Sequence, residues 1–208
     1  MILLIDHEDS FTQNLSGALA VLGEDIGILD AKAATLSKVE RFDPTAIILS
    51  SGPGSPEDWP ESMEIVREFG ADVPILGVSL GQLIIAAAYG EGKSRRTQIR
   101  HGKPAMVRHK RGGLFAYLPQ PLRVMCCHSA ALDEGALPEV LHADAYSMDD
   151  NTVMAVRHDR HPVYGLMFHP ESVGTERGER LLAAFLEEAK AFNKQKENAS
   201  GPQRIPGL

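Results

Sequence analysis

Short, continuously apolar runs alternate with amphipathic segments through the first half of the chain. The apolar runs lie at residues 2–5, 46–49 and 74–78, and such runs are typical of strands buried on both faces. Between the first two runs, residues 10–22 carry apolar side chains at helical spacing, and Gly23 is a suitable stop. Strands that alternate with helices in this way predict a parallel sheet of the α/β class.

The second half has shorter apolar stretches, which are interrupted by Gly, Pro and Asp. Stretches at residues 106–107, 122–126 and 153–156 predict a smaller antiparallel portion of the sheet. A last apolar strand at 163–168 is followed by an amphipathic segment at 176–192, which predicts a closing helix.

These elements predict one domain over residues 1–192, with an open, mainly parallel central sheet flanked by helices. Residues 193–208 are polar and contain Gly and Pro, so we expect a mobile tail there. A length of 208 residues, with 43% hydrophobic and 24% charged residues, fits one ordinary globular domain. The net charge of −7 argues against a nucleic-acid-binding face, which needs clustered Lys and Arg.

Several other classes of protein are disfavoured by particular residues. Asp6 ends the first apolar run too early for a signal peptide or a membrane span, so we expect a cytoplasmic protein without membrane contact. The two cysteines, Cys126 and Cys127, are adjacent in the sequence. Adjacent cysteines rarely satisfy the geometry of a disulfide, so we expect no disulfide here. The eight histidines lack the paired spacing of a zinc site, and we expect neither a metal nor another cofactor.

The strongest local signal for chemistry is the sequence Gly77-Val78-Ser79-Leu80-Gly81, between a buried strand and a helical pattern. Its glycines permit a sharp turn, and the first N–H groups of the helix can stabilise negative charge. It matches the Gly-x-Ser-x-Gly pattern of serine hydrolases. Taken alone, it fits equally well a tight strand-to-helix turn without a catalytic role.

A base and an orienting acid for Ser79 can also be named. His169 and Glu171 are two residues apart, so on an extended segment both face the same side, and the carboxylate could orient the imidazole. In an α/β-hydrolase the acid precedes the histidine, whereas here the histidine comes first. The order therefore argues against that fold and leaves a triad of Ser79, His169 and Glu171.

A second loop, residues 50–56, follows the strand at 46–49 and lies at the same carboxyl edge of the sheet, where ligands collect. Its glycines expose backbone N–H groups, and one of them could form an oxyanion hole with the N–H of Leu80. The alternative interpretation is that this loop is a Gly/Pro turn without a functional role.

Many motifs in the same order resemble the class I glutamine amidotransferases, in particular the glutaminase subunits of anthranilate synthase and aminodeoxychorismate synthase. The resemblance covers nearly the whole chain and implies a flavodoxin-like sheet. Residues 132–138 tilt it slightly towards the aminodeoxychorismate branch. The motifs are Asp9-Ser10-Phe11-Thr12, Ser51-Gly52-Pro53-Gly54-Ser55-Pro56, the elbow around Ser79, His101-Gly102-Lys103, His128-Ser129 and Phe168-His169-Pro170-Glu171-Ser172.

The resemblance implies a role for each matching residue. In that family a cysteine at the elbow attacks the side-chain amide of glutamine, and the released ammonia passes to a chorismate-binding synthase subunit. Ser79 stands at the nucleophile's position, His169 at the base's and Glu171 at the orienting acid's. The amides of Gly54 and Leu80 would hold the oxyanion. The substrate-binding positions are Gly52, Pro53, Gly54, Leu83, Ser129 and Ala130.

The chain departs from the family pattern inside this pocket. The family elbow usually reads Gly-Val-Cys-Leu-Gly-His-Gln, so Ser79 replaces the cysteine and Leu83 replaces a glutamine-binding Gln. The usual Arg-Tyr-His-Ser-Leu has become Cys126-Cys127-His128-Ser129-Ala130. An alcohol is much less acidic than a thiol, so we expect weak or absent glutamine hydrolysis.

Two hypotheses remain: an impaired working glutaminase subunit, or a non-catalytic scaffold or regulator of the partner. Ser79 alone could be an engineered change, but the surrounding substitutions favour natural divergence. We expect Cys127 to be a small apolar core residue rather than a substitute nucleophile, and His128 to be a structural neighbour of the pocket. We interpret the other histidines as surface or packing residues, namely His7, His109, His142, His158 and His161.

Overall fold

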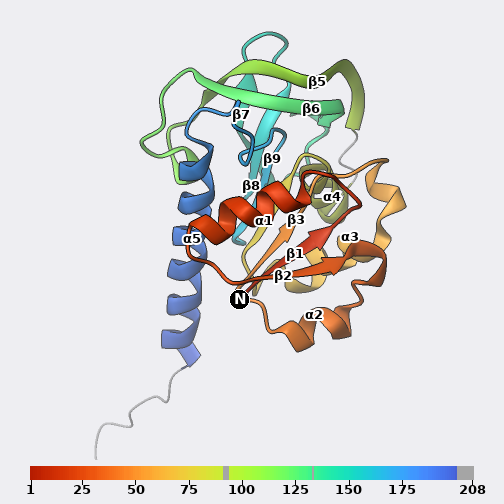
Figure 1. The fold of residues 1–208 in the computed structure, drawn as a ribbon, viewed down its shortest axis with the longest axis vertical. Helices are drawn as coiled ribbons and strands as arrows, with labels where there is room; N and C mark the ends of the chain where they lie inside the picture. The colour runs from red at the N-terminus through yellow and green to blue at the C-terminus, as the bar shows by residue number, and fades with distance from the viewer. Residues whose placement is uncertain (91–93, 133, 201–208) are drawn as a thin grey trace, which may run out of the picture.

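The computed structural model describes residues 1–90, 94–132 and 134–200. Within these residues, nine strands form one sheet in the order β2-β1-β3-β4-β9-β8-β7-β5-β6 (Figure 1). The strands are β1 (Ile2–Asp6), β2 (Ile26–Asp30), β3 (Ala46–Leu49), β4 (Ile75–Val78), β5 (Ser94–His109), β6 (Leu122–Leu132), β7 (Leu141–Ser147), β8 (Val153–His158) and β9 (Val163–Leu166). The α-helices are α1 (Thr12–Val21), α2 (Leu36–Phe42), α3 (Pro60–Phe69), α4 (Leu80–Tyr89) and α5 (Gly178–Ser200). Short 3-10 helices are η1 (Ala31–Ala33), η2 (Pro56–Asp58), η3 (Gly113–Phe115) and η4 (Glu134–Ala136).

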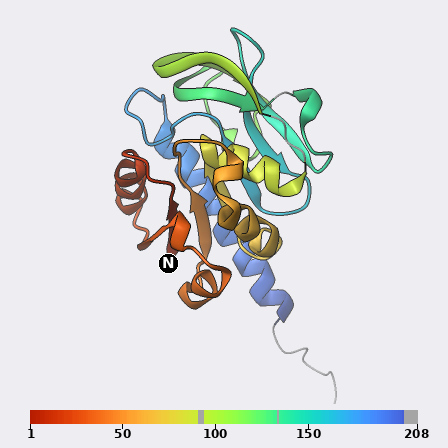
Figure 2. The same ribbon diagram turned by 90° about the vertical axis from the view of Figure 1, so that its right-hand side faces the viewer.

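The parallel half of the sheet consists of β2, β1, β3, β4 and β9. Every residue of β3 and β4 is buried, because helices cover both faces of these strands. Figure 2 shows α1 on one side of the parallel strands and α3 and α4 on the other. The expected α/β architecture is therefore confirmed, and the carboxyl ends of β3, β4 and β9 meet at one edge.

The antiparallel half adds β8, β7, β5 and β6, with β8 pairing directly to β9. The long pair β5 and β6 lies over the carboxyl edge of the parallel strands (Figure 1). Its register shifts between Arg96 and Arg100 and again between His101 and Lys103, which bends the pair. This bend positions β6 beside the elbow at Ser79.

The C-terminal helix α5 is longer than the closing helix that the sequence predicts at residues 176–192. Residues 193–200 continue α5 to Ser200, where we had expected a mobile tail from residue 193. Polar side chains attach this part to the rest of the molecule: Asn193 Nδ2 donates to the carbonyl of Thr45 at 2.8 Å, and Lys196 Nζ pairs with Asp72 Oδ1 at 2.9 Å. Residues 201–208, the remainder of the expected tail, lie outside the described residues.

Candidate active site

Ser79 lies at a sharp turn between β4 and α4. Its backbone angles, φ 54° and ψ −106°, are strained for a residue with a side chain. A Cβ at Gly77 would overlap the backbone of Gly81, and one at Gly81 would lie 2.9 Å from Leu49 Cβ and closer still to the carbonyl oxygen of that residue. Both glycines are therefore needed for the turn, which presents Ser79 at the carboxyl edge of the sheet.

Ser79 is fixed by its backbone more firmly than by its side chain. Its N–H donates to the carbonyl of Leu166 at 2.7 Å, which continues the pairing of β4 with β9. Its hydroxyl donates to the carbonyl of Cys127 over 3.4 Å, a long and weak hydrogen bond. The hydroxyl is therefore held in place only loosely.

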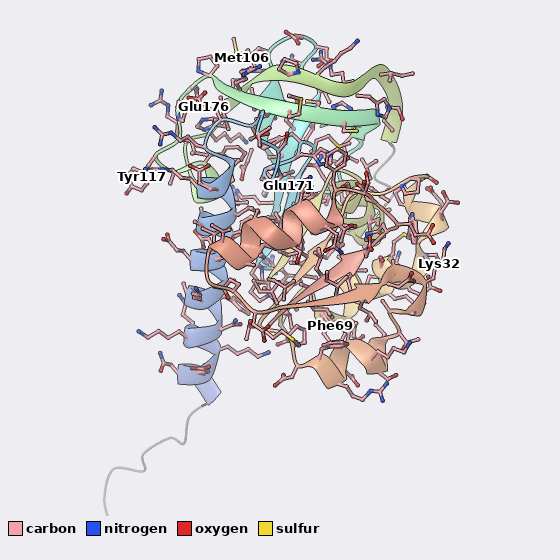
Figure 3. The ribbon with its side chains drawn as sticks, viewed as in Figure 1. Lys32, Phe69, Met106, Tyr117, Glu171 and Glu176 are labelled. Carbon is pink, nitrogen blue, oxygen red and sulfur yellow. The ribbon has the colours of Figure 1, made fainter. Side chains whose placement is uncertain are left out.

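His169 and Glu171 form the contact that their spacing predicts. The Nδ1 atom of His169 lies 2.6 Å from Glu171 Oε1, and the two side chains are 3% and 1% exposed. In the neutral imidazole, the carboxylate at Nδ1 favours the tautomer that carries its proton on that nitrogen and its lone pair on Nε2. Nε2 is buried and has no hydrogen-bond partner in the described part of the chain, and the Phe11 ring lies 5.3 Å from the imidazole. Figure 3 shows Glu171 between the antiparallel strands and α1.

Strand β6 holds Ser79 and His169 beside each other. The carbonyl of Met125 accepts the backbone N–H of His169 at 3.0 Å, and that of Cys127 accepts the Ser79 hydroxyl. Carbonyls two residues apart on a strand point the same way and are separated by about 6.6 Å. Ser79 and His169 thus occupy neighbouring positions along one strand, although no hydrogen bond joins their side chains among the described contacts.

A cavity of about 150 Å³ opens at the elbow. Every oxyanion and substrate-binding position expected from the sequence lines it, and so does Ser79, whereas His169 and Glu171 are not part of its lining. The lining residues are Gly52, Pro53, Gly54, Ser79, Leu80, Leu83, His101, Cys127, His128, Ser129, Ala130 and Met167. Leu83 contributes an apolar wall, because its side chain cannot hydrogen-bond a substrate.

Two backbone amides of the cavity are suited to hold an anion. Gly54 has φ 81°, and a Cβ there would overlap the carboxylate of Asp58, which already accepts the N–H of Ser55 at 2.8 Å. Leu80 is the first residue of α4, so its N–H has no partner within the helix. Both residues line the cavity, and their amides remain the predicted oxyanion hole.

His7 packs against Gly52 in the loop at residues 50–56. Its Nδ1 lies 3.2 Å from Ser50 Oγ and its Nε2 2.9 Å from Ser62 Oγ, while its ring meets Trp59 edge-on at 5.0 Å. A Cβ at Gly52 would collide with His7, so the close approach requires glycine. Burial lowers the pKa of His7 to about 4. His7 is thus a packing residue, as the sequence indicated.

We expect the stability of the protein to decrease as the pH falls from about 6.5 towards 4. In this window the unfolded chain protonates its histidines, whereas the folded chain keeps His7 neutral, so stability rises with pH. The His7 contribution to the slope should be about 1.4 kcal/mol per pH unit. Urea unfolding at several pH values measures it. His7→Gln should reduce the slope and the exposed control His142→Gln should not; equal slopes in all three proteins would contradict the assignment.

His128 is a buried residue of the cavity wall, and neither of its ring nitrogens has a hydrogen-bond partner among the described residues. Burial, together with the positive charge of Arg100, lowers the pKa of His128 to about 4, so the ring is neutral near pH 7. The alternation along β6 could have indicated that His128 faces inward, since Cys126 and Val124 do so as well.

Cys127 is not the core residue that we expected. It is half-buried, lines the cavity and has Sγ 3.3 Å from His101 Nδ1, while the alternation of the strand places Cys126 in the core instead. Burial raises the pKa of the Cys127 thiol, with the charge of Asp9 acting in the same direction. The thiolate is therefore disfavoured, which argues against Cys127 as a substitute nucleophile.

The described residues contain no cluster of three or more His, Cys, Asp or Glu that could hold a metal ion. In the same part of the chain, we find no helix with both the length and the apolar composition needed to cross a membrane.

Comparisons with known proteins agree on one family. A family model described as glutamine amidotransferase class-I matches residues 3–189. Aminodeoxychorismate synthase component 2 of Escherichia coli is 37% identical over 89% of this chain and 99% of its own length. Anthranilate synthase component 2 of Pseudomonas aeruginosa is 38% identical over 89% of this chain and 94% of its own.

A longer relative and a solved structure show the same similarity. The bifunctional protein TrpGD of Thermotoga maritima is 39% identical over 89% of this chain, which spans only 32% of that protein. The crystal structure of a protein from Thermoplasma acidophilum, described as a GMP synthase subunit, superposes with a TM-score of 0.81 at 22% identity, covering 94% of this chain and 96% of the other. At that identity the superposition shows a shared fold.

Proposed function

We propose, from the premise that this chain belongs to the class I glutamine amidotransferase family, that it is the glutaminase-type subunit of a complex with a chorismate-using synthase. The relatives that match over nearly their whole length are named as second components of anthranilate or aminodeoxychorismate synthase. The name component 2 implies that each of these relatives works together with a component 1. The partner is accordingly a synthase subunit that binds chorismate, and the small molecule is L-glutamine.

The observation that carries the proposal is the convergence of three segments on one cavity. The Gly52–Gly54 loop, the elbow at Ser79 and the stretch Ser129–Ala130 line it together, although they are far apart in the sequence. In the proposal Ser79 is the nucleophile, His169 is the general base and acid, and Glu171 orients His169. The amides of Gly54 and Leu80 receive the oxyanion.

The proposed glutaminase activity is weak because Ser79 is the nucleophile. Attack on the amide releases ammonia and leaves an ester on Ser79, which water then hydrolyses to glutamate. A serine hydroxyl is far less acidic than a thiol, so its activation by an imidazole is less complete. Leu83 adds a second cause, because it contributes no hydrogen bond to the bound amino acid.

A second candidate function is a subunit that folds or regulates its partner without hydrolysing glutamine. One contact favours it: the Ser79 hydroxyl donates to the carbonyl of Cys127 and not to His169. In this case the synthase would use ammonia from solution. The intact His169–Glu171 pair favours the first candidate.

Purification of the partner together with this chain tests both candidates. We expect the tagged chain to retain a chorismate-binding subunit, and the complex to use ammonium faster than glutamine. Synthesis with glutamine that Ser79→Ala abolishes would support the weak glutaminase, and synthesis with ammonium alone would support the second candidate. Failure to retain such a subunit from the source organism, with both proteins folded, would contradict the assignment to this complex.

A further inference from the structure

The elbow of this chain has the local features of a serine hydrolase. The strained backbone at Ser79 is imposed by two glycines that cannot carry a Cβ. Such strain is concentrated at functional sites. The turn therefore presents a hydroxyl group at the mouth of a cavity.

The base beside this hydroxyl is available. Glu171 occupies Nδ1 of His169, which leaves the Nε2 lone pair buried and unmatched by any described group. The competing contact of the Ser79 hydroxyl, 3.4 Å to the Cys127 carbonyl, is weak. Catalytic hydrogen bonds are often loose before substrate binds. Catalysis by Ser79 therefore requires its hydroxyl to rotate from the Cys127 carbonyl towards His169.

The cavity has few features for a charged substrate. Among the described residues that line it, there is no Asp, Glu, Lys or Arg side chain. Leu83, Met167 and Ala130 form apolar walls, and His128 is neutral near pH 7. An apolar acyl chain would bury its surface favourably against these walls.

One polar group of the cavity still lacks a partner. His128 is 5% exposed, it lines the cavity, and both of its ring nitrogens are without a hydrogen bond among the described residues. A neutral imidazole carries one donor and one acceptor. It therefore suits the oxygen atoms of an ester or of the alcohol that an ester releases.

We infer that this site is also a serine-type acyl hydrolase for small, uncharged esters with a short apolar acyl chain. The volume of about 150 Å³ limits the acyl group to a few carbon atoms. An ester suits a weakly activated hydroxyl better than an amide, because amide resonance makes the carbonyl carbon less reactive. This activity goes beyond the proposed glutaminase function and rests on the same three residues.

The reaction proceeds in two balanced steps. In the first, Ser79 Oγ bonds to the acyl carbon, its proton passes to His169 Nε2, and the alcohol leaves with that proton as its carbon–oxygen bond breaks. In the second, water bonds to the acyl carbon and gives a proton to His169; the bond between that carbon and Ser79 Oγ then breaks, and His169 returns the proton to Oγ. The products are one alcohol and one carboxylic acid, and the enzyme is regenerated.

Release of p-nitrophenol from p-nitrophenyl acetate, butyrate and octanoate by the full chain tests the inference. We expect turnover of acetate and butyrate, at least tenfold less for octanoate, and a loss of about a hundredfold or more in Ser79→Ala. Leu83→Gln should lower kcat/KM for butyrate more than for acetate. Mass spectrometry after treatment with a fluorophosphonate should find the label on Ser79.

Cys127→Ser separates serine catalysis from acylation of the nearby thiol: fluorophosphonate should label Ser79 in this variant, and its remaining turnover should be lost when Ser79→Ala is added. Turnover that is lost in Cys127→Ser but kept in Ser79→Ala would overturn the inference. So would the absence of both turnover and labelling in protein that melts cooperatively. Neither result affects retention of a synthase partner, so failure of this inference is distinguishable from failure of the proposed function.

Discussion

Ser79→Cys should increase the rate of glutamine hydrolysis by about a hundredfold or more and still leave it well below the rate expected of an intact family site. The increase follows from the lower pKa of a thiol, near ~8.5, which allows a neighbouring imidazole to form the thiolate. The shortfall follows from Leu83, which lines the cavity where the family has a hydrogen-bonding Gln. Ammonia release by the complex with the partner subunit measures both.

The matched variant is Ser79→Cys combined with Leu83→Gln, for which we expect a further tenfold or greater gain, mainly as a lower KM. Ser79→Ala is the control without a nucleophile and should release no ammonia above background. Complete recovery by Ser79→Cys alone would contradict the role of Leu83, and would also favour the interpretation of Ser79 as an engineered change.

Gly81→Ala should destabilise the protein by about 3 kcal/mol or more, the second large effect that we expect. An added Cβ would press against Leu49 on β3, and neither β3 nor α4 can move without disturbing the buried strands. The free energy of unfolding in urea measures the loss. Ser79-dependent labelling should decrease in parallel, because the same turn positions the hydroxyl.

Gly17→Ala is the control for this substitution. Gly17 lies in the interior of α1, and nothing is found within 4 Å of a Cβ built there. Alanine should therefore stabilise the helix by about 0.5–1 kcal/mol. A loss of stability at Gly17 similar to that at Gly81 would mean that crowding is not the cause of the effect at the elbow.

The buried strands could be predicted from the sequence because burial on both faces leaves a continuous apolar run, as in β1, β3 and β4. The edge strand β2 is short and contains Gly27, and the antiparallel strand β7 is interrupted by polar residues, so neither has an uninterrupted run of large apolar side chains. Residues of β2 are half-buried or exposed, and β7 alternates between buried and less buried positions with alanines on its inner face. Their pairing depends on neighbours that are distant in the sequence.

In the candidate site, too, some features could be predicted from the sequence and others could not. The contact of His169 with Glu171 follows from spacing on an extended segment, and the structure places them 2.6 Å apart. The position of β6 could not be predicted, because it depends on the bulged pairing with β5. Alternation along β6 separates His128 from Cys127, but which of the two faces meets the elbow depends on that pairing. The roles of these residues remain predictions.

The order of strands also determines when the molecule can fold during its synthesis. β9 is the last strand along the chain, yet it lies in the middle of the sheet between β4 and β8. Until residue 166 has left the ribosome, β4 and β8 each have an unpaired edge that can recruit other chains. The nascent protein therefore completes this core only after β9 has emerged, and the serine, the histidine and their supporting strand meet only after residue 169 has followed.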